Sequence, residues 1–144
     1  MNLPHLFSPT KLGALELANR IVMAPMTRNR AEADGTPSAL MAEHYGARAQ
    51  AGLIVAEGAW PEVDGQAYCR QPGIATPAHI QGWRRVTDAV HQRGGRIVLQ
   101  IMHSGRIGSR HIKPAGARTV APSALAARGE IWTDAAGMQP FDVP

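Results

Sequence analysis

The sequence predicts an α/β fold, because three short apolar runs alternate with two longer segments that carry helix start and stop signals. The runs lie at residues 20–24, 53–56 and 96–101. Their apolar residues are nearly continuous rather than alternating. A strand of that kind has to be covered on both faces, which is typical of a parallel sheet. The predicted order is therefore strand, helix, strand, helix, strand.

The two helices are predicted from the residues at their ends. The first begins at Thr36 and ends at Gly52, and the second begins at Thr76 and ends at Gly94; proline follows each threonine. A threonine hydroxyl can accept a hydrogen bond from an unpaired N–H of the first turn, and proline fits the first helical position. Glycine provides the left-handed residue that ends a helix.

The segments outside this alternation are predicted to be irregular or short. Residues 6–17 are expected to form a hairpin with its turn at residues 11–13. Residues 104–144 are rich in Gly, Ala and Pro and are expected to form a long loop over an active face. Three parallel strands with two crossovers leave two unpaired sheet edges. This stretch by itself is therefore not expected to form a closed fold.

Composition narrows the class of protein. The net charge is +4, but the basic residues are spread along the chain without interleaved aromatics, which argues against a nucleic-acid surface. No apolar stretch reaches about 18 residues, so no membrane span is expected. Cys69 is the only cysteine and allows no internal disulfide. The first residues lack the layout of a signal peptide, and the expected location is cytoplasmic.

Hydrogen-bonding or small residues follow each apolar run, where α/β sheets bind their ligands. Thr27 follows the first run, Gly58 the second, and Gln100 closes the third. The amide of Gln100 matches the alternating acceptors and donor on the pyrimidine edge of an isoalloxazine ring. Thr27 can donate to the C4 carbonyl or N5 of such a ring, and Gly58 allows the backbone to approach it.

Four segments resemble the old yellow enzyme family, in that family's order and spacing, and together they span essentially the whole chain. They are residues 6–9 with 17–28 (LFSP and LANRIVMAPMTR), 51–57 (AGLIVAE), 82–91 (GWRRVTDAVH) and 100–106 (QIMHSGR). The resemblance implies a (β/α)8 TIM barrel, which needs eight strand–helix units in about 200–250 residues. Residues 1–144 would be the amino-terminal part of that single domain, with the carboxy-terminal remainder absent.

The resemblance also implies an activity and a set of site residues. The family reduces flavin mononucleotide (FMN) with NAD(P)H and passes hydride from flavin N5 to the β-carbon of an activated alkene such as an enone. The expected partners are this small-molecule alkene and the remainder of the barrel, with a homo-oligomer also considered. The implied FMN-binding residues are Pro25, Met26, Thr27, Gly58 and Gln100, and the implied substrate-binding residues are Tyr68 and Met102.

Two departures limit what the resemblance carries over. Met102 stands where many relatives have tryptophan, so substrate shape does not transfer. The family's substrate-holding His/Asn or His/His pair, its tyrosine proton donor and its phosphate-binding loops would all follow residue 144. No catalytic residue is therefore assigned within this chain, and no metal site is expected because His103 and His111 have no acidic partner at ligand spacing.

Simpler interpretations stay open for each site. Thr27 could satisfy loop backbone, Gln100 could be a buried amide bonded to its neighbours, and His103 could bond to the loop that follows it. Two other functions are also open. One is a related flavin barrel, such as a dienoyl reductase. The other is a half-barrel without catalytic activity that pairs with another chain.

Overall fold

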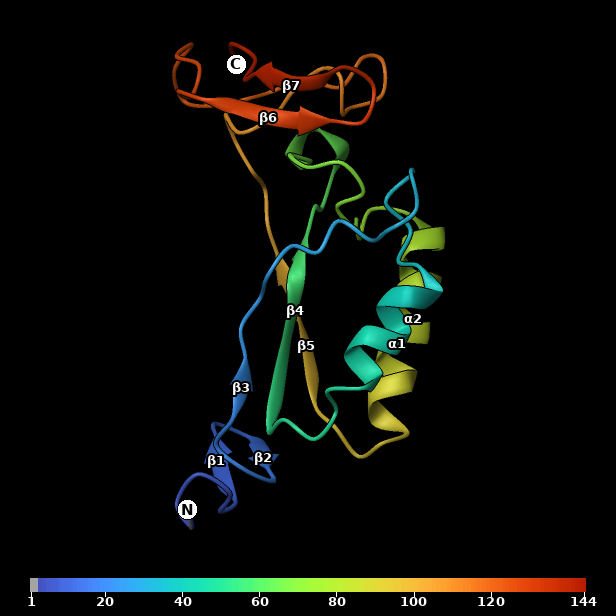
Figure 1. Ribbon diagram of the computed structural model, residues 1–144, viewed down its shortest axis with the longest axis vertical. Coiled ribbons are helices and arrows are strands. Elements are labelled where there is room, and N and C mark those ends of the chain that lie inside the picture. Colours follow the sequence, from blue (N-terminus) through green and yellow to red (C-terminus); the bar gives the residue numbers. More distant parts are fainter. Residues whose placement is uncertain (1–2) are drawn as a thin grey trace.

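The computed structural model describes residues 3–144, so the first two residues of the chain lie outside it (Figure 1). Its centre is a three-stranded parallel sheet in the order β3 (Val22–Met23), β4 (Leu53–Ala59), β5 (Ile97–Ile101). Val22 lies opposite Leu53, and Ile54 lies opposite Ile97. The predicted parallel sheet is confirmed, with β3 shorter than the apolar run from which it was predicted.

Both helices lie against the same face of this sheet (Figure 1). They are α1 (Ala39–Gly46) and α2 (Pro77–His91), and they enclose the main apolar core of the described residues. Ile54 and Ala56 from β4 meet Val86 and Val90 from α2 there, and all four are fully buried. The outer strands are less protected, since Val22 of β3 is 50% exposed and Ile101 of β5 is 58% exposed.

The start of α2 is as predicted. The Thr76 hydroxyl accepts a hydrogen bond from the His79 N–H (3.2 Å), and Pro77 occupies the first turn. His79 takes the place that Glu or Gln has in most capping boxes. Its Nδ1 accepts from the N–H groups of Ala75 and Thr76, so Nε2 carries the proton and donates to the Asp34 carbonyl (3.0 Å). The imidazole thereby ties the helix start to the β3–α1 loop.

The predicted boundaries of α1 were wrong at both ends. Its N-cap is Ser38, whose hydroxyl accepts from the Met41 N–H, whereas Thr36 lies in the preceding turn, where its own N–H donates to Asp34. The proline after Thr36 packs against Gly82 of α2, so a contact of the loop before α1 outweighs the local signal. Regular helix ends at Gly46, and residues 47–50 continue as turns.

Two hairpins lie at opposite ends of the sheet (Figure 1). The predicted amino-terminal hairpin is confirmed: β1 (Thr10–Leu12) pairs antiparallel with β2 (Leu15–Leu17). The second hairpin was not predicted. It consists of β6 (Glu130–Thr133) and β7 (Gly137–Pro140), within the segment expected to be irregular. Apart from this hairpin, residues 104–144 form turns and loops.

A single turn of 3-10 helix, η1 (Val63–Gly65), follows β4. Neither helix within residues 3–144 is both long and apolar enough to cross a lipid bilayer.

Candidate functional site

The carboxyl ends of the three parallel strands point toward the end of the sheet that carries the β6–β7 hairpin (Figure 1). A register shift between Ala56 and Gly58 of β4 brings Gly58 directly opposite Gln100 of β5. Gly58 is buried and Gln100 is half-buried. Two of the residues predicted to bind flavin are therefore neighbours across the β4–β5 ladder.

Thr27 lies in the segment that follows β3. This segment is extended, with Pro25 and Thr27 half-buried and Met26 50% exposed. The N–H of the next residue, Arg28, donates to the Glu57 carboxylate (3.0 Å), so Thr27 lies beside the residue that precedes Gly58. Met26 is placed differently, since it lines an open cavity with Phe7 on the outer edge of the sheet.

The Met102 side chain lies close to Gly58, on the side where a Cβ would stand. A Cβ added at Gly58 would lie 2.8 Å from Met102 Cε and 2.9 Å from Met102 Cβ. The Met102 N–H donates to the Ala59 carbonyl (3.0 Å), which holds Met102 over the end of β4. Any side chain larger than hydrogen at position 58 would displace Met102, so the two residues form one contact surface.

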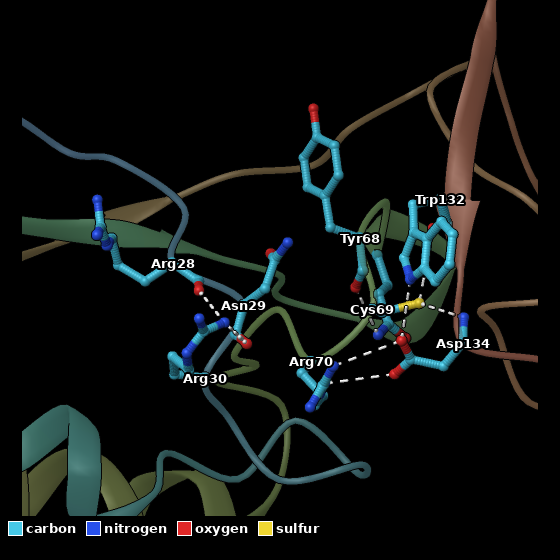
Figure 2. Close-up of polar contacts among 9 residues, drawn as sticks. Arg28, Asn29, Arg30, Tyr68, Cys69, Arg70, Trp132 and Asp134 are labelled. Carbon is cyan, nitrogen blue, oxygen red and sulfur yellow. Dashed lines mark hydrogen bonds and ion pairs between the residues drawn. The ribbon is translucent and has the colours of Figure 1, made fainter. Parts of the chain in front are cut away.

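Tyr68 lies in the loop after η1. Its backbone N–H and that of Ala67 both donate to the amide oxygen of Gln71, a fully buried side chain whose own N–H donates to the Gly58 carbonyl (3.1 Å). Gln71 therefore links the Tyr68 loop to the end of β4. Figure 2 shows the Tyr68 phenol pointing away from the other labelled side chains.

Next to Tyr68, the loop is fastened to the β6–β7 hairpin (Figure 2). The Cys69 thiol donates to the Trp132 carbonyl (3.7 Å) and accepts from the Asp134 N–H (3.3 Å). Arg70 forms an ion pair with the Asp134 carboxylate (3.3 Å). Cys69 is thus a hydrogen-bonding partner of the hairpin.

His103 bonds to the loop that follows it, as its simpler interpretation expects. Its Nδ1 accepts from the Gly105 N–H (3.1 Å).

Lys113 lies further along the same segment. It is 6% exposed, and its ammonium group donates to the carbonyls of Asp64 (2.7 Å) and Arg118 (2.8 Å). Burial lowers the pKa of Lys113. These contacts hold residues 104–119 against η1.

Glu57 and Tyr45 were missed as site residues. Glu57 is fully buried at the end of β4, and the Tyr45 hydroxyl on α1 donates to its carboxylate (3.0 Å). Burial raises the pKa of both side chains. A charged residue directly after an apolar strand run is a signal for Glu57, because a carboxylate is seldom buried without partners. Tyr45 gives no such signal, since it looks like part of the apolar face of a helix.

Comparison with known proteins gives a consistent result. Residues 5–136 match the NADH:flavin oxidoreductase / NADH oxidase family. A probable flavin mononucleotide-dependent alkene reductase of Leishmania infantum is 38% identical over 96% of this chain and 39% of its own length. The old yellow enzyme homologue of Zymomonas mobilis is 42% identical, with a TM-score of 0.91 over 97% of this chain and 39% of that one.

Morphinone reductase in complex with tetrahydroNAD is also 42% identical, with a TM-score of 0.89 over 99% of this chain and 40% of that one. The chain thus spans about two fifths of the length of these relatives. Its two helices and parallel strands correspond to part of a TIM barrel, as predicted, and the predicted FMN and NAD(P)H are the cofactors of this group of enzymes. The chain belongs to the NADH:flavin oxidoreductase / NADH oxidase family, the family of old yellow enzyme.

Proposed function

We propose that this chain provides part of the FMN site of an ene-reductase, as the amino-terminal part, residues 1–144, of one flavin-binding (β/α)8 domain. Bound FMN would take hydride from NAD(P)H and deliver it from N5 to the β-carbon of an activated alkene such as an enone. The observation that carries the proposal is the pairing of Gly58 with Gln100, next to the hydrogen bond between Arg28 and Glu57.

The residues fit a planar ring with a hydrogen-bonding edge. Gln100 would offer its amide to the pyrimidine edge, and Thr27 would donate to the C4 carbonyl or N5, favouring the reduced ring. Gly58, with Pro25 and Met26 in the extended segment, would provide backbone contact. Tyr68 and Met102 would border the alkene.

The test is to assemble this chain with the carboxy-terminal part of the Zymomonas mobilis relative; we call the product the assembled protein. We expect it to bind FMN, to show the visible absorption of a flavoprotein and to oxidise NAD(P)H when an enone is present. Neither part alone should do so. A colourless and inactive product would contradict the proposal.

Two substitutions locate the FMN site within the assembled protein. Gln100→Ala removes up to two hydrogen bonds to the ring and should raise the FMN dissociation constant about tenfold or more. Thr27→Ala should change the flavin potential more than the affinity, because it removes a bond that favours the reduced ring. Lys11→Ala is the control, since its ion pair with Glu16 lies on the exposed amino-terminal hairpin.

One alternative has a specific observation in its favour. Val22, Val98 and Ile101, on the two outer strands, are 50%, 40% and 58% exposed. A half-barrel that pairs its open strands with another copy would cover them. That interpretation predicts a stable homodimer without flavin, which size-exclusion chromatography combined with an absorption spectrum distinguishes from the flavoprotein.

A further inference from the structure

Glu57 is a buried carboxylate between two segments that we expect to contact FMN. It follows Ala56 in β4 and precedes Gly58, at the point where the β4–β5 register shifts. Both Ala56 and Glu57 turn toward the helices: Ala56 packs in the core, and Glu57 bonds to Tyr45 of α1. In a regular strand these neighbours would point to opposite faces. The irregularity therefore places the carboxylate on the helix side of the sheet.

Every hydrogen bond described for this carboxylate fixes the position of another element. One oxygen accepts from the Tyr45 hydroxyl (3.0 Å), and the other accepts from the Arg28 N–H (3.0 Å). The Tyr45 hydroxyl in turn accepts from the Glu57 N–H (2.9 Å). α1, the end of β4 and the segment after β3 are thus joined through two side chains.

This arrangement is a costly way to stabilise a fold. Glu57 is 0% exposed and Tyr45 is 1% exposed, and burying a carboxylate opposes its ionisation. A well-packed apolar pair would often be as stable. An apolar pair could not accept the hydrogen bond of the Arg28 N–H, and so could not fix the backbone next to Thr27. The bonds therefore indicate a role in geometry.

We propose that Glu57 and Tyr45 are positioning residues that hold Thr27 and Gly58 in the arrangement that FMN requires, so that they act on the flavin potential through Thr27. The proposal rests on the proposed function, because it assumes that FMN binds at these strand ends. Neither residue is expected to touch FMN or substrate.

The test uses Glu57→Gln and Tyr45→Phe in the assembled protein. An amide has one acceptor oxygen, so Glu57→Gln leaves either the Arg28 N–H or the Tyr45 hydroxyl without its acceptor. Tyr45→Phe removes one donor to the carboxylate and serves if Glu57→Gln does not fold. Each variant should lower the ratio of affinities for reduced and oxidised FMN by about threefold to tenfold, the factor expected from one weakened hydrogen bond. Amide hydrogen exchange at Arg28 should also become faster.

The discriminating measurement repeats these substitutions in a Thr27→Ala background. If Glu57 and Tyr45 act through Thr27, they should no longer change the flavin potential there, although they should still reduce stability. Trp83→Phe is the matched control. It removes the buried hydrogen bond that the Trp83 indole on α2 donates to the Gly73 carbonyl (2.9 Å), and it should lower stability without changing the potential in either background.

The outcomes separate this inference from the proposed function. If Thr27→Ala shifts the potential but Glu57→Gln and Tyr45→Phe do not, the positioning role is wrong and the FMN site stands. Equal shifts with and without Thr27 would overturn the route through Thr27. If the unmodified assembled protein binds no FMN, or Thr27→Ala leaves the bound flavin unaffected, the proposed site fails, and the positioning role fails with it.

Discussion

Residues 22–101, which include the parallel sheet and both helices, and residues 104–144 are held in place by different interactions. The first region combines a parallel ladder with an apolar core in which Ile54, Val86 and Val90 are fully buried. The second is fastened mainly by single polar contacts to partners distant in sequence, such as those of Lys113 with Asp64. Burial along a periodic pattern defines the first region, whereas individual hydrogen bonds define the second.

The largest expected difference between the regions comes from deleting apolar side chains in each. Ile54→Ala should lower the free energy of unfolding of the assembled protein by about 2–5 kcal/mol, because the shortened side chain leaves a cavity in the core. Ile131→Ala, at a buried residue of the β6–β7 hairpin, should cost less, since Ile131 lies outside the main apolar core. Urea denaturation measures both. Equal costs would show that the second region has a core of its own.

The next effect concerns the polar contacts. Lys113→Met keeps most of the side chain but removes the hydrogen bonds of its ammonium group to Asp64, Arg118 and Thr119. We expect the free energy of local unfolding of residues 104–119 to fall by about 1.5–3 kcal/mol, since hydrogen bonds to charged groups contribute about that much. Limited proteolysis within residues 104–119 should become faster while the urea midpoint of the core changes little. Lys11→Met, in an exposed ion pair, is the control.

Sequence patterns predicted the first region better than the second, and the reason is visible in particular residues. The apolar runs identified all three parallel strands, and their shared direction brought Gly58 next to Gln100. The β6–β7 hairpin was missed because it lies in a stretch rich in Gly, Ala and Pro, which was expected to be irregular. It is attached through Cys69 and Asp134, which are distant in sequence and give no periodic signal.

Even in the first region, local signals failed where another element intervened. Thr36 and Thr76 are each followed by proline, yet only Thr76 caps a helix. Glu57 could have been recognised as a charged residue next to a buried run. Its hydrogen bond to the Arg28 N–H could not, because it depends on the path of the segment after β3. The identity of a residue at a strand end is thus easier to predict than its partners.

The two threonines allow a smaller test of this point. Thr76→Ala should cost about 1 kcal/mol, as expected for the loss of an N-cap. Thr36→Ala should be close to neutral, because its buried hydroxyl has no hydrogen-bond partner within residues 3–144. Thermal denaturation of the two variants compares them directly. A similar cost for both would mean that Thr36 caps α1 after all.

The smallest effect is a difference in pH dependence. Burial raises the pKa of Glu57, so the folded state holds this proton more tightly than the unfolded state, and the Glu57 contribution to stability falls as pH rises through the raised pKa. Burial lowers the pKa of Lys113, so its contribution rises as pH rises from the lowered pKa toward the ordinary value. Urea midpoints measured across pH should show this. The Glu57→Gln variant should lose the fall in stability with rising pH, and the Lys113→Met variant should lose the rise. Unchanged curves would contradict the assignment.

The thiol at position 69 offers a built-in reporter. Its sulfur is hydrogen-bonded to the backbone on both sides of Thr133, and the sequence contains no second cysteine to compete for a reagent. The rate of alkylation should therefore measure how often the hairpin lifts away from the loop beneath it. A single chemical label could follow that motion without any engineered probe.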